Sequence, residues 1–381
     1  MIHLDHHATT PCDPRVVEAM LPWFTEKFGN AASVEHAFGW EAAKAVDRAR
    51  EEVAAIINAD PREIVFTSGA TEANNLAIKG VLAAAGRSRR LVTNAAEHRA
   101  VLDPARRIVR AGCEVTVLKV DSLGRLDPAA VERELRRAPP ALVSVMAANN
   151  EVGTLNPLDE IGALCRAAGA LFHTDAAQAI GRIPFDVRAL PVDLASISAH
   201  KLYGPKGVGA LWVRRRPRIR IEPLLDGGGH ENRLRSGTLP VPLIVGFGVA
   251  CRIARECLEE ESRRLSALRD LLWEALRTKL PDLRMNGDPA RRLPGNLNVS
   301  VPGVDGDALL AGLTEIAVSS GSACSSAHPE PSHVLAAMGV PDELRRASLR
   351  FGLGRSNTAA EIDRAAEVVG EVVARMRGVS P

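Results

Sequence analysis

The residues most able to do chemistry are a lysine and an aspartate that each follow a short apolar run. Lys201 comes just after residues 194–198 and precedes a glycine-containing turn, and Asp175 ends the run that begins at residue 171. A lysine amine can form a Schiff base with an aldehyde, and a carboxylate can keep a pyridine nitrogen protonated. The pair therefore predicts a site for pyridoxal phosphate (PLP), whose protonated ring is an electron sink. The alternative is a buried ion pair that only stabilises the core.

Residues 67–75, Thr-Ser-Gly-Ala-Thr-Glu-Ala-Asn-Asn, join an expected strand to an expected helix and suit a phosphate group. The glycine permits a tight turn, and the first N–H groups of a helix have no acceptor within the helix. We expect Ala70 and Thr71 to contact the phosphate, and Ser198 and His200 to add donors from beside the lysine. The alternative is an ordinary helix N-cap, where Ser and Thr are common.

Three further polar side chains fall near expected strand ends. His98 opens an expected helix, and its flat imidazole can stack on a cofactor ring and move protons. A lone histidine is more often a surface or satisfied core residue. Asn150 follows an expected strand, and Gln178 lies three residues after Asp175. Either side-chain amide can donate to the phenolic oxygen of the cofactor.

The second half of the chain supplies a thiol and a guanidinium. Residues 318–327, Val-Ser-Ser-Gly-Ser-Ala-Cys-Ser-Ser-Ala, are small and polar and predict a mobile loop. Its one reactive group, Cys324, is suited to attack a substrate sulfur and carry it away, whereas the alternative is a chance cysteine in a linker. Arg350 lies in an expected short strand and suits bidentate binding of an amino-acid carboxylate. The alternative there is a structural ion pair.

The elements that must position these residues alternate between strand and helix from about residue 62 to residue 213. This alternation predicts βαβ units and a mainly parallel sheet with helices on both faces. Ligands of such sheets bind beyond the carboxyl ends of the strands. Expected strands cover residues 63–67, 91–93, 114–118, 141–146, 170–174 and 193–198, and expected helices cover 71–82 and 100–111. A smaller α+β lobe is predicted from a long helix, 242–279, strands 296–300, 316–318 and 349–351, and helices 306–313 and 359–375.

Composition excludes several classes of protein. The 381 residues carry 48 Lys and Arg against 46 Asp and Glu, a balance that argues against a dedicated nucleic-acid binder. No run of eighteen apolar residues predicts a membrane span, and the N-terminus lacks the features of a signal peptide, so we expect a cytoplasmic protein with reduced thiols. The six cysteines are scattered and predict neither a zinc site nor a disulfide framework. The basic cluster at residues 214–220 is interpreted as a solvated strand end, with a role in meeting an acidic partner as the weaker alternative.

Taken together, these motifs resemble the cysteine desulfurases of the IscS/NifS type, group I of the class V branch of fold-type I PLP enzymes. The resemblance covers nearly the whole chain and includes residues 4–11, 28–30, 227–231 and 235–240. It implies an α/β fold with a mainly parallel seven-stranded sheet sandwiched by helices and a smaller α+β C-terminal lobe. The implied large PLP-binding domain is residues 1–250, with arm 1–15 packing on the small lobe. The implied small domain, residues 251–381, carries the mobile loop of Cys324.

The resemblance also implies residue roles. Lys201 is the Schiff-base lysine, Cys324 becomes the persulfide, and His98 stacks on the ring as an acid–base group. The implied cofactor-binding residues are Ala70, Thr71, His98, Asn150, Asp175, Gln178, Ser198, His200, Lys201 and Thr238. The last of these is expected to reach the phosphate of the neighbouring subunit in a homodimer. Arg350 and Asn30 are the implied substrate contacts, while the His6-His7 pair departs from the pattern of many relatives and has no implied role.

The implied activity is conversion of L-cysteine to L-alanine, with the sulfane sulfur passing from Cys324 to an acceptor such as an iron–sulfur scaffold. No metal is implied in the isolated chain, although Cys324 could transiently ligate a cluster shared with a scaffold. The sequence ends at Pro381, before the longer tail by which group I housekeeping members dock that scaffold, so the acceptor stays open. The alternatives are a selenocysteine lyase, another class V lyase or aminotransferase, and a non-enzymatic scaffold with a decayed site.

Overall fold

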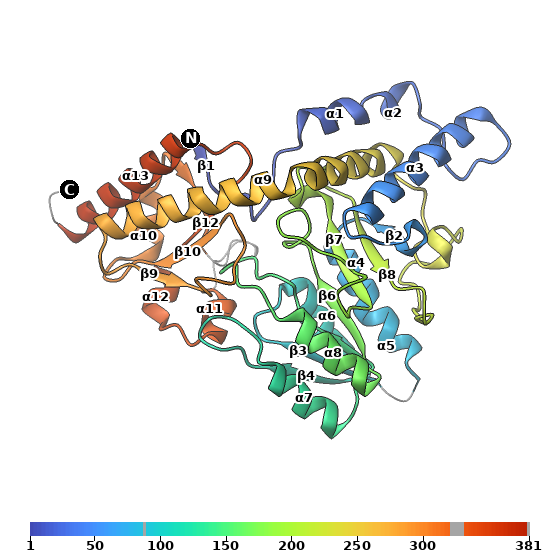
Figure 1. The fold of residues 1–381 in the computed structure, drawn as a ribbon, viewed down its shortest axis with the longest axis horizontal. Coiled ribbons are helices and arrows are strands. Elements are labelled where there is room, and N and C mark those ends of the chain that lie inside the picture. Colours follow the sequence, from blue (N-terminus) through green and yellow to red (C-terminus); the bar gives the residue numbers. More distant parts are fainter. Residues whose placement is uncertain (87–88, 321–330, 379–381) are drawn as a thin grey trace.

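The computed structural model describes residues 1–86, 89–320 and 331–378, and its largest element is a seven-stranded sheet (Figure 1). The strand order is β2-β8-β7-β6-β5-β3-β4, and β8 alone runs antiparallel to its neighbours. The predicted mainly parallel sheet of seven strands is therefore confirmed. The strands are β2 (Ile64–Thr67), β3 (Arg90–Asn94), β4 (Glu114–Leu118), β5 (Leu142–Ser144), β6 (Leu171–Asp175), β7 (Leu194–Ser198) and β8 (Gly209–Val213).

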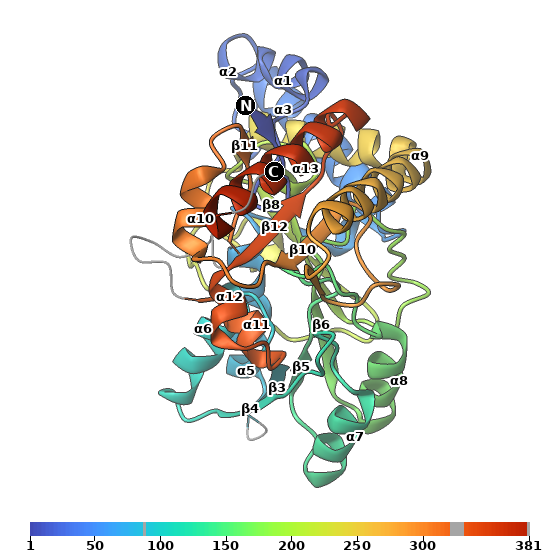
Figure 2. The same ribbon diagram turned by 90° about the vertical axis from the view of Figure 1, so that its left-hand side faces the viewer.

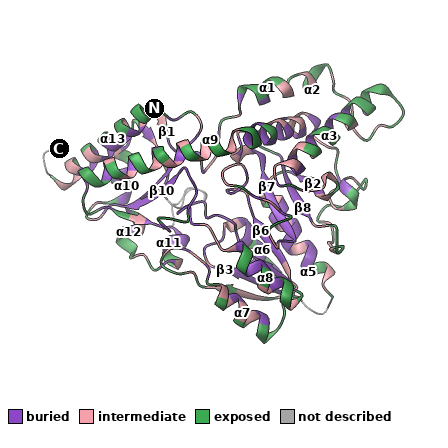
Figure 3. Ribbon diagram, viewed as in Figure 1, coloured by how far each residue is buried: buried purple, intermediate pink, exposed green. Residues whose placement is uncertain are grey.

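Helices cover both faces of this sheet because alternate side chains of its strands point to opposite faces. In β2, Val65 packs with α4, the π-helical turn η2 and α6, whereas Ile64 and Phe66 pack in the core that includes α3, α7 and α8. Buried residues accordingly concentrate in the central strands and on the inner faces of the helices (Figure 3). The helices of this region are α1 (Pro14–Met20), α2 (Pro22–Thr25), α3 (Ala37–Ala55), α4 (Ala70–Asn75), η2 (Leu76–Gly80), α5 (Val81–Ala84), α6 (Arg99–Val109), α7 (Pro128–Arg137) and α8 (Leu158–Ala168), with the 3-10 turns η1 (Pro61–Glu63), η3 (Ala199–Lys201) and η4 (Glu231–Arg233).

A smaller lobe follows, built on the antiparallel sheet β12-β10-β9. The first residues of the chain join this lobe, since β1 pairs with β11 and Asp5 bridges to Gly352 (Figure 2). Residues 2–5 of the N-terminal arm therefore pack on strands from the C-terminal part of the chain. The elements are β1 (Ile2–His3), β9 (Arg284–Asn286), β10 (Asn296–Ser300), β11 (Ile316–Ala317) and β12 (Ser348–Gly352), with α10 (Gly306–Gly312), α11 (His333–Ala337), α12 (Asp342–Arg346) and α13 (Ala359–Arg377).

Helix α9 (Val241–Lys279) runs through both lobes and is 39 residues long, about 58 Å at the helical rise of 1.5 Å per residue. Its first half packs on α3, and its second half packs on α13. Phe247 belongs to the core of the large sheet and Leu272 to the separate core of the small lobe. The predicted domain boundary at residue 250 lies inside this helix and stays a prediction. No helix in the described ranges is long and apolar enough to span a membrane.

The close approach of α3 to α9 depends on a glycine, and this dependence can be tested. A Cβ added at Gly248 would lie 2.6 Å from the Cα of Ala49, a backbone atom that cannot move aside alone. We expect Gly248→Ala to lower the free energy of unfolding by about 1–3 kcal/mol, measured by urea denaturation. Gly370→Ala in α13 is the matched control, because the atoms nearest to the added Cβ belong to the flexible Lys279 side chain, at 3.0 Å and beyond, and alanine favours a helix by about 1 kcal/mol. Equal destabilisation by both substitutions would contradict this account of the packing.

Candidate active site

A cavity of about 500 Å³ opens beyond the carboxyl ends of the parallel strands. Its wall includes the loops that follow β2, β3, β5, β6 and β7, as the rule for open α/β sheets predicts. The structure brings nine of the ten predicted cofactor-binding residues together in this wall. They are Ala70, Thr71, His98, Asn150, Asp175, Gln178, Ser198, His200 and Lys201.

Lys201 is held by the N-terminal arm. It lies in the 3-10 turn directly after β7, and its Nζ donates to the carbonyl oxygens of His7 and Ala8, the latter at 2.8 Å. Both the backbone N–H and the hydroxyl of Thr10 donate to the carbonyl oxygen of His200, at 3.0 and 2.9 Å. The arm therefore forms the wall of the cavity beside the lysine. Sequence reasoning found the motif at residues 4–11 but not this function for it.

The structure also explains the His6-His7 pair. The Nδ1 of His7 donates to Oε1 of Gln178 at 2.9 Å, and Nε2 of Gln178 donates back to the carbonyl oxygen of His7 at 2.9 Å. Burial holds the pKa of His7 well below its usual range, so the ring is neutral. His6 packs edge-on against His3 with ring centroids 4.6 Å apart, and burial lowers its pKa to about 4. The His7 ring therefore ties the arm to Gln178, and neither ring adds charge.

Asp175 ends β6 with its carboxylate oriented by two donors. Nδ2 of Asn74 donates to one carboxylate oxygen at 2.6 Å, and the backbone N–H of Ala177 donates to the other at 3.0 Å. The carboxylate lines the cavity, where it can accept from a protonated ring nitrogen. Sequence reasoning did not single out Asn74, although it lies inside the predicted motif of residues 67–75.

His98 is the N-cap of α6 and faces the cavity as a neutral ring. Its Nδ1 accepts from the backbone N–H of Ala100 at 3.0 Å, so this nitrogen carries no proton. Burial lowers the pKa of His98. The charge of Asp175 raises this pKa, and the charge of Lys201 lowers it further. The neutral imidazole therefore carries its proton on Nε2.

The start of α4 can receive an anion. Its N-cap, Gly69, has a φ of +153° and no side chain to cap the helix, and a Cβ there would meet no atom within 4 Å. The N–H groups of Ala70 and Thr71 lie in the first turn, where a helix offers no internal acceptor. The hydroxyls of Thr71 and Ser198 lie in the same wall. Nδ1 of His200 shares a hydrogen bond with Oγ1 of Thr9 at 3.1 Å. Burial lowers the pKa of His200 to about 4.

This set of groups fits pyridoxal phosphate. One cavity offers an amine for an aldehyde, an oriented carboxylate for a pyridine nitrogen, a flat neutral imidazole and an uncapped helix start for a phosphate. The unfilled space at Gly69 gives the phosphate room to approach the backbone.

Arg350 is fully buried in β12 next to this site. Its Nη2 donates to Asp5 at 2.7 Å, and its Nη1 donates to the carbonyl oxygen of Asn150 at 3.2 Å. The structural ion pair considered as an alternative therefore exists. Its Nε, however, has no hydrogen-bond partner among the described residues. A buried donor without a partner is costly, so this N–H lacks an acceptor, although Arg350 itself does not line the cavity.

Four predicted residues do not line the cavity. Arg350 is buried beside it, and Asn30 and Thr238 are exposed. Oδ1 of Asn30 accepts from the N–H of Ala32 at 2.9 Å. Cys324 lies outside the described residues.

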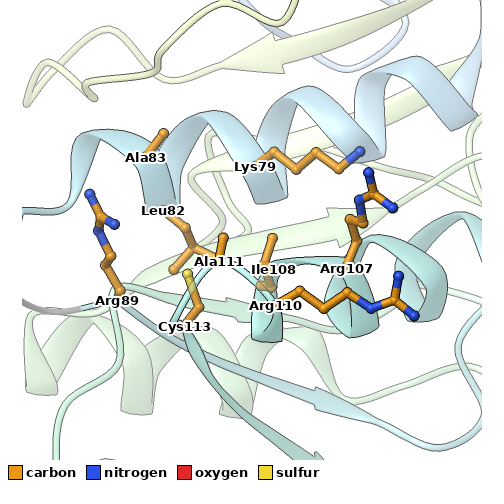
Figure 4. A pocket seen from close by; sticks show the side chains of 9 residues that line it. All are labelled: Lys79, Leu82, Ala83, Arg89, Arg107, Ile108, Arg110, Ala111 and Cys113. Atoms are coloured by element: carbon orange, nitrogen blue, oxygen red, sulfur yellow. The ribbon is translucent and has the colours of Figure 1, made fainter.

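A second hollow, of about 690 Å³, lies at the opposite end of the sheet, since its lining residues Arg89 and Cys113 precede β3 and β4 (Figure 4). Lys79, Arg107 and Arg110 contribute three further cations from the helices beside it. Neither a carboxylate nor an imidazole of the described residues lines this hollow. It therefore lacks the partner that a pyridine nitrogen needs and does not compete as the cofactor site.

The chain is similar to known proteins over nearly its whole length. The family model "aminotransferase class-V" matches residues 2–365. Over 381 residues the chain is 56% identical to the cysteine desulfurase IscS of Anaeromyxobacter dehalogenans, spanning all of this chain and 94% of that protein. It is 49% identical to the cysteine desulfurase of Homo sapiens, spanning all of this chain and 83% of that protein. A solved NifS-like protein matches with a TM-score of 0.91 and 37% identity over 98% of this chain and 99% of the other. The solved structure of DndA from Streptomyces lividans matches with a TM-score of 0.78 and 40% identity, over 91% of this chain and 97% of the other.

Glu97, next to His98, is a buried acid that sequence reasoning did not single out. It is completely buried, and its Oε1 accepts from Asn94 Nδ2 at 2.5 Å and from the N–H of Met146 at 2.7 Å. Its Oε2 has no partner among the described residues. Burial raises the pKa of Glu97 to about 8, so the carboxyl is protonated at neutral pH.

This protonation predicts how stability depends on pH. Because the pKa of Glu97 is about 8 in the folded chain and about 4.5 in the unfolded chain, the folded state binds the extra proton between these values, and stability falls as pH rises through the window. We expect Glu97→Gln, which keeps the Oε1 acceptor, to reduce the loss of unfolding free energy between pH 5.5 and 7.5 by about 2 kcal/mol. Urea denaturation at both pH values measures this difference. Glu132→Gln on the exposed face of α7 is the control, and an unchanged pH dependence in Glu97→Gln would show that this carboxyl is ionised throughout.

Proposed function

The chain belongs to the class-V aminotransferase family, and we propose that Lys201, His98 and Cys324 carry out its reaction. The protein is a PLP-dependent cysteine desulfurase, which converts L-cysteine to L-alanine and removes the sulfur. The observation that supports the assignment of residues is the convergence of Lys201, Asp175 and His98 in one cavity at the strand ends.

When bound, pyridoxal phosphate supplies an electron sink for charge that develops at the substrate α-carbon. Asp175 would hold the ring nitrogen through the carboxylate that Asn74 and Ala177 orient. The N–H groups at the start of α4, with Ser198 and His200, would hold the phosphate. The amides of Asn150 and Gln178 would face the phenolic oxygen. The positions of these residues in the cavity wall support the proposed contacts.

Arg350 binds and orients the substrate. Its unpartnered Nε–H can donate to one oxygen of the α-carboxylate, while Asp5 and the carbonyl of Asn150 hold the rest of the guanidinium. Lys201 Nζ, held beside the N-terminal arm, is the amine that can take and return a proton at the substrate α-carbon. His98 keeps its proton on Nε2, from which it can donate to a reacting group. Asn30 stays a predicted substrate contact.

Cys324 is the sulfur carrier in this proposal. Its thiolate attacks the sulfur of the substrate, and a sulfur–sulfur bond forms as the carbon–sulfur bond breaks. The electron pair of the broken bond stays with the β-carbon, which takes up a proton, and the carbon skeleton leaves as L-alanine. An aminotransferase has no need of such a thiol, and a selenocysteine lyase can release selenium without one. An iron–sulfur scaffold as acceptor and a cytoplasmic location remain predictions from the sequence.

We further propose that the protein acts as a C₂ homodimer through the surface of α1, α2 and the start of α3. Large apolar side chains are exposed along this stretch, among them Phe28 and Phe38, whose stacked rings have centroids 5.4 Å apart. They are Val17, Leu21, Phe24, Phe28, Val34, Phe38 and Trp40, each 41–76% exposed. Apolar surface of this extent is characteristic of an interface. Thr238, exposed and outside the cavity of its own chain, would reach the phosphate of the partner's site.

The role of Cys324 is tested by Cys324→Ala. The variant should still bind the cofactor, show its visible absorbance and, after borohydride reduction, carry the label on Lys201. Alanine production from L-cysteine should fall by two to three orders of magnitude, about 3–4 kcal/mol of transition-state stabilisation. Cys324→Ser should fare no better, whereas Cys257→Ala in α9 should keep full activity. Near wild-type turnover in Cys324→Ala would favour the selenocysteine lyase, and a label on Lys206 would overturn the lysine assignment.

The dimer is tested by Phe24→Asp, whose side chain is 55% exposed in the single chain. Sedimentation at micromolar concentration should show a wild-type dimer and a folded variant shifted toward monomer, with activity lost in proportion. Leu271→Asp, which changes an exposed apolar residue in the second half of α9, should leave both unchanged. A fully active wild-type monomer at assay concentration would refute the proposal.

A further inference from the structure

Two adjacent residues at the start of α11 bond to loops of the large lobe. Ser332 caps this helix, since its Oγ accepts from the N–H of Leu335 at 3.0 Å. The same Oγ donates to a carboxylate oxygen of Glu151, and both side chains are buried. The buried hydroxyl is therefore shared between its own helix and the loop that follows β5.

His333 makes the second bond. Its Nε2 donates to the carbonyl oxygen of Glu97 at 2.9 Å. Burial lowers the pKa of His333, so the ring is neutral and its proton is on the nitrogen that makes this bond. Apolar packing of Val334 and Leu335 against Ala96 and Val152 lies next to both hydrogen bonds.

Each of these two acceptors is the chain neighbour of a residue in the cofactor cavity. Glu151 follows Asn150, and Glu97 precedes His98; both neighbours line the cavity. The acceptors are themselves fixed. The carbonyl oxygen of Glu151 accepts from Asn298 Nδ2 at 3.1 Å, and the N–H of Glu151 donates to Asn149 Oδ1 at 2.8 Å. The start of α11 is thus bonded to two rigid points at the edge of the site.

We propose that Ser332 and His333 are positioning residues for sulfur transfer, which fix the point from which the chain carrying Cys324 extends. Cys324 lies eight residues before Ser332 in the sequence. Eight extended residues span at most about 29 Å, so the place of Ser332 limits where the thiol can go. The inference rests on the proposed role of Cys324 and assigns no structure to the residues between them.

The test separates positioning from loss of a helix cap. In the holoenzyme, Ser332→Ala should leave the cofactor spectrum and the concentration dependence on L-cysteine within about twofold of wild type. The single-turnover rate at which sulfur appears on Cys324 should fall tenfold or more. Thr358→Ala is the matched control, because Thr358 caps α13 in the same way and lines no part of the cavity. Both substitutions remove a cap that contributes about 1 kcal/mol, but only the first should slow sulfur loading.

His333 provides a second, independent variant. His333→Leu removes the donor to Glu97 and should slow sulfur loading, whereas His333→Gln restores an N–H donor and should recover most of the rate. Hydrogen exchange of the amides of residues 334–338 should rise in Ser332→Ala and stay unchanged in Thr358→Ala, which reports the loosened anchor without reference to turnover.

Two sets of results would overturn the inference. Wild-type loading rates in Ser332→Ala and His333→Leu, or equal slowing by Thr358→Ala, would defeat it and leave the proposed function standing. Absence of sulfur on Cys324 of the wild type would defeat the proposed function, and this inference with it.

Discussion

The architecture of the site depends on one fully buried cation, the guanidinium of Arg350. A buried charge needs a charged partner, because its desolvation costs several kcal/mol. Asp5 from the N-terminal arm supplies the pairing charge, and the carbonyl of Asn150 supplies a second acceptor. One side chain of the small lobe therefore requires both the arm and a strand-end loop of the large sheet to be in place.

The arm that Arg350 requires also shapes the cofactor site. Two and three residues beyond Asp5, the carbonyls of His7 and Ala8 accept from Lys201, and His7 exchanges two hydrogen bonds with Gln178. Arg182 adds a donor to the carbonyl of His6 at 2.8 Å. The substrate end of the site and its lysine end are thus built on the same ten residues of chain, so a disturbance of the arm is expected to reach both.

Burial also sets the charge pattern of the site. It lowers the pKa values of His7, His98 and His200 and raises that of Glu97, which leaves three imidazoles and one carboxyl neutral near pH 7. The donors and acceptors that remain are oriented by hydrogen bonds from the backbone or from neighbouring side chains. Such preorganised groups stabilise developing charge without having to rearrange.

Much of this site could be predicted from the sequence, because the signals are local. Polar residues directly after buried strands, such as Asp175 and Lys201, must meet at one rim of a parallel sheet. Nine cavity residues followed from that rule and from the family resemblance, and most expected strands agree with the structure to within one or two residues. The helices α1 and α3 were not assigned, although the alanine-rich sequence of α3 carried a helical signal.

Only the tertiary structure decided which distant residues hold the site in place. Asp5 and Arg350 are 345 residues apart in the sequence. Lys201 donates to the carbonyl of His7, which lies 194 residues away in the sequence. No periodicity or motif encodes such pairs, since each contact exists only after the sheet, the arm and the small lobe have packed together. The exposure of Asn30 and Thr238 was likewise decided by packing, because burial depends on segments that lie far away in the sequence. The sequence by itself determined the chemistry that was available, and the folded chain determined how each reactive group is oriented, because orientation comes from partners that lie far away along the chain.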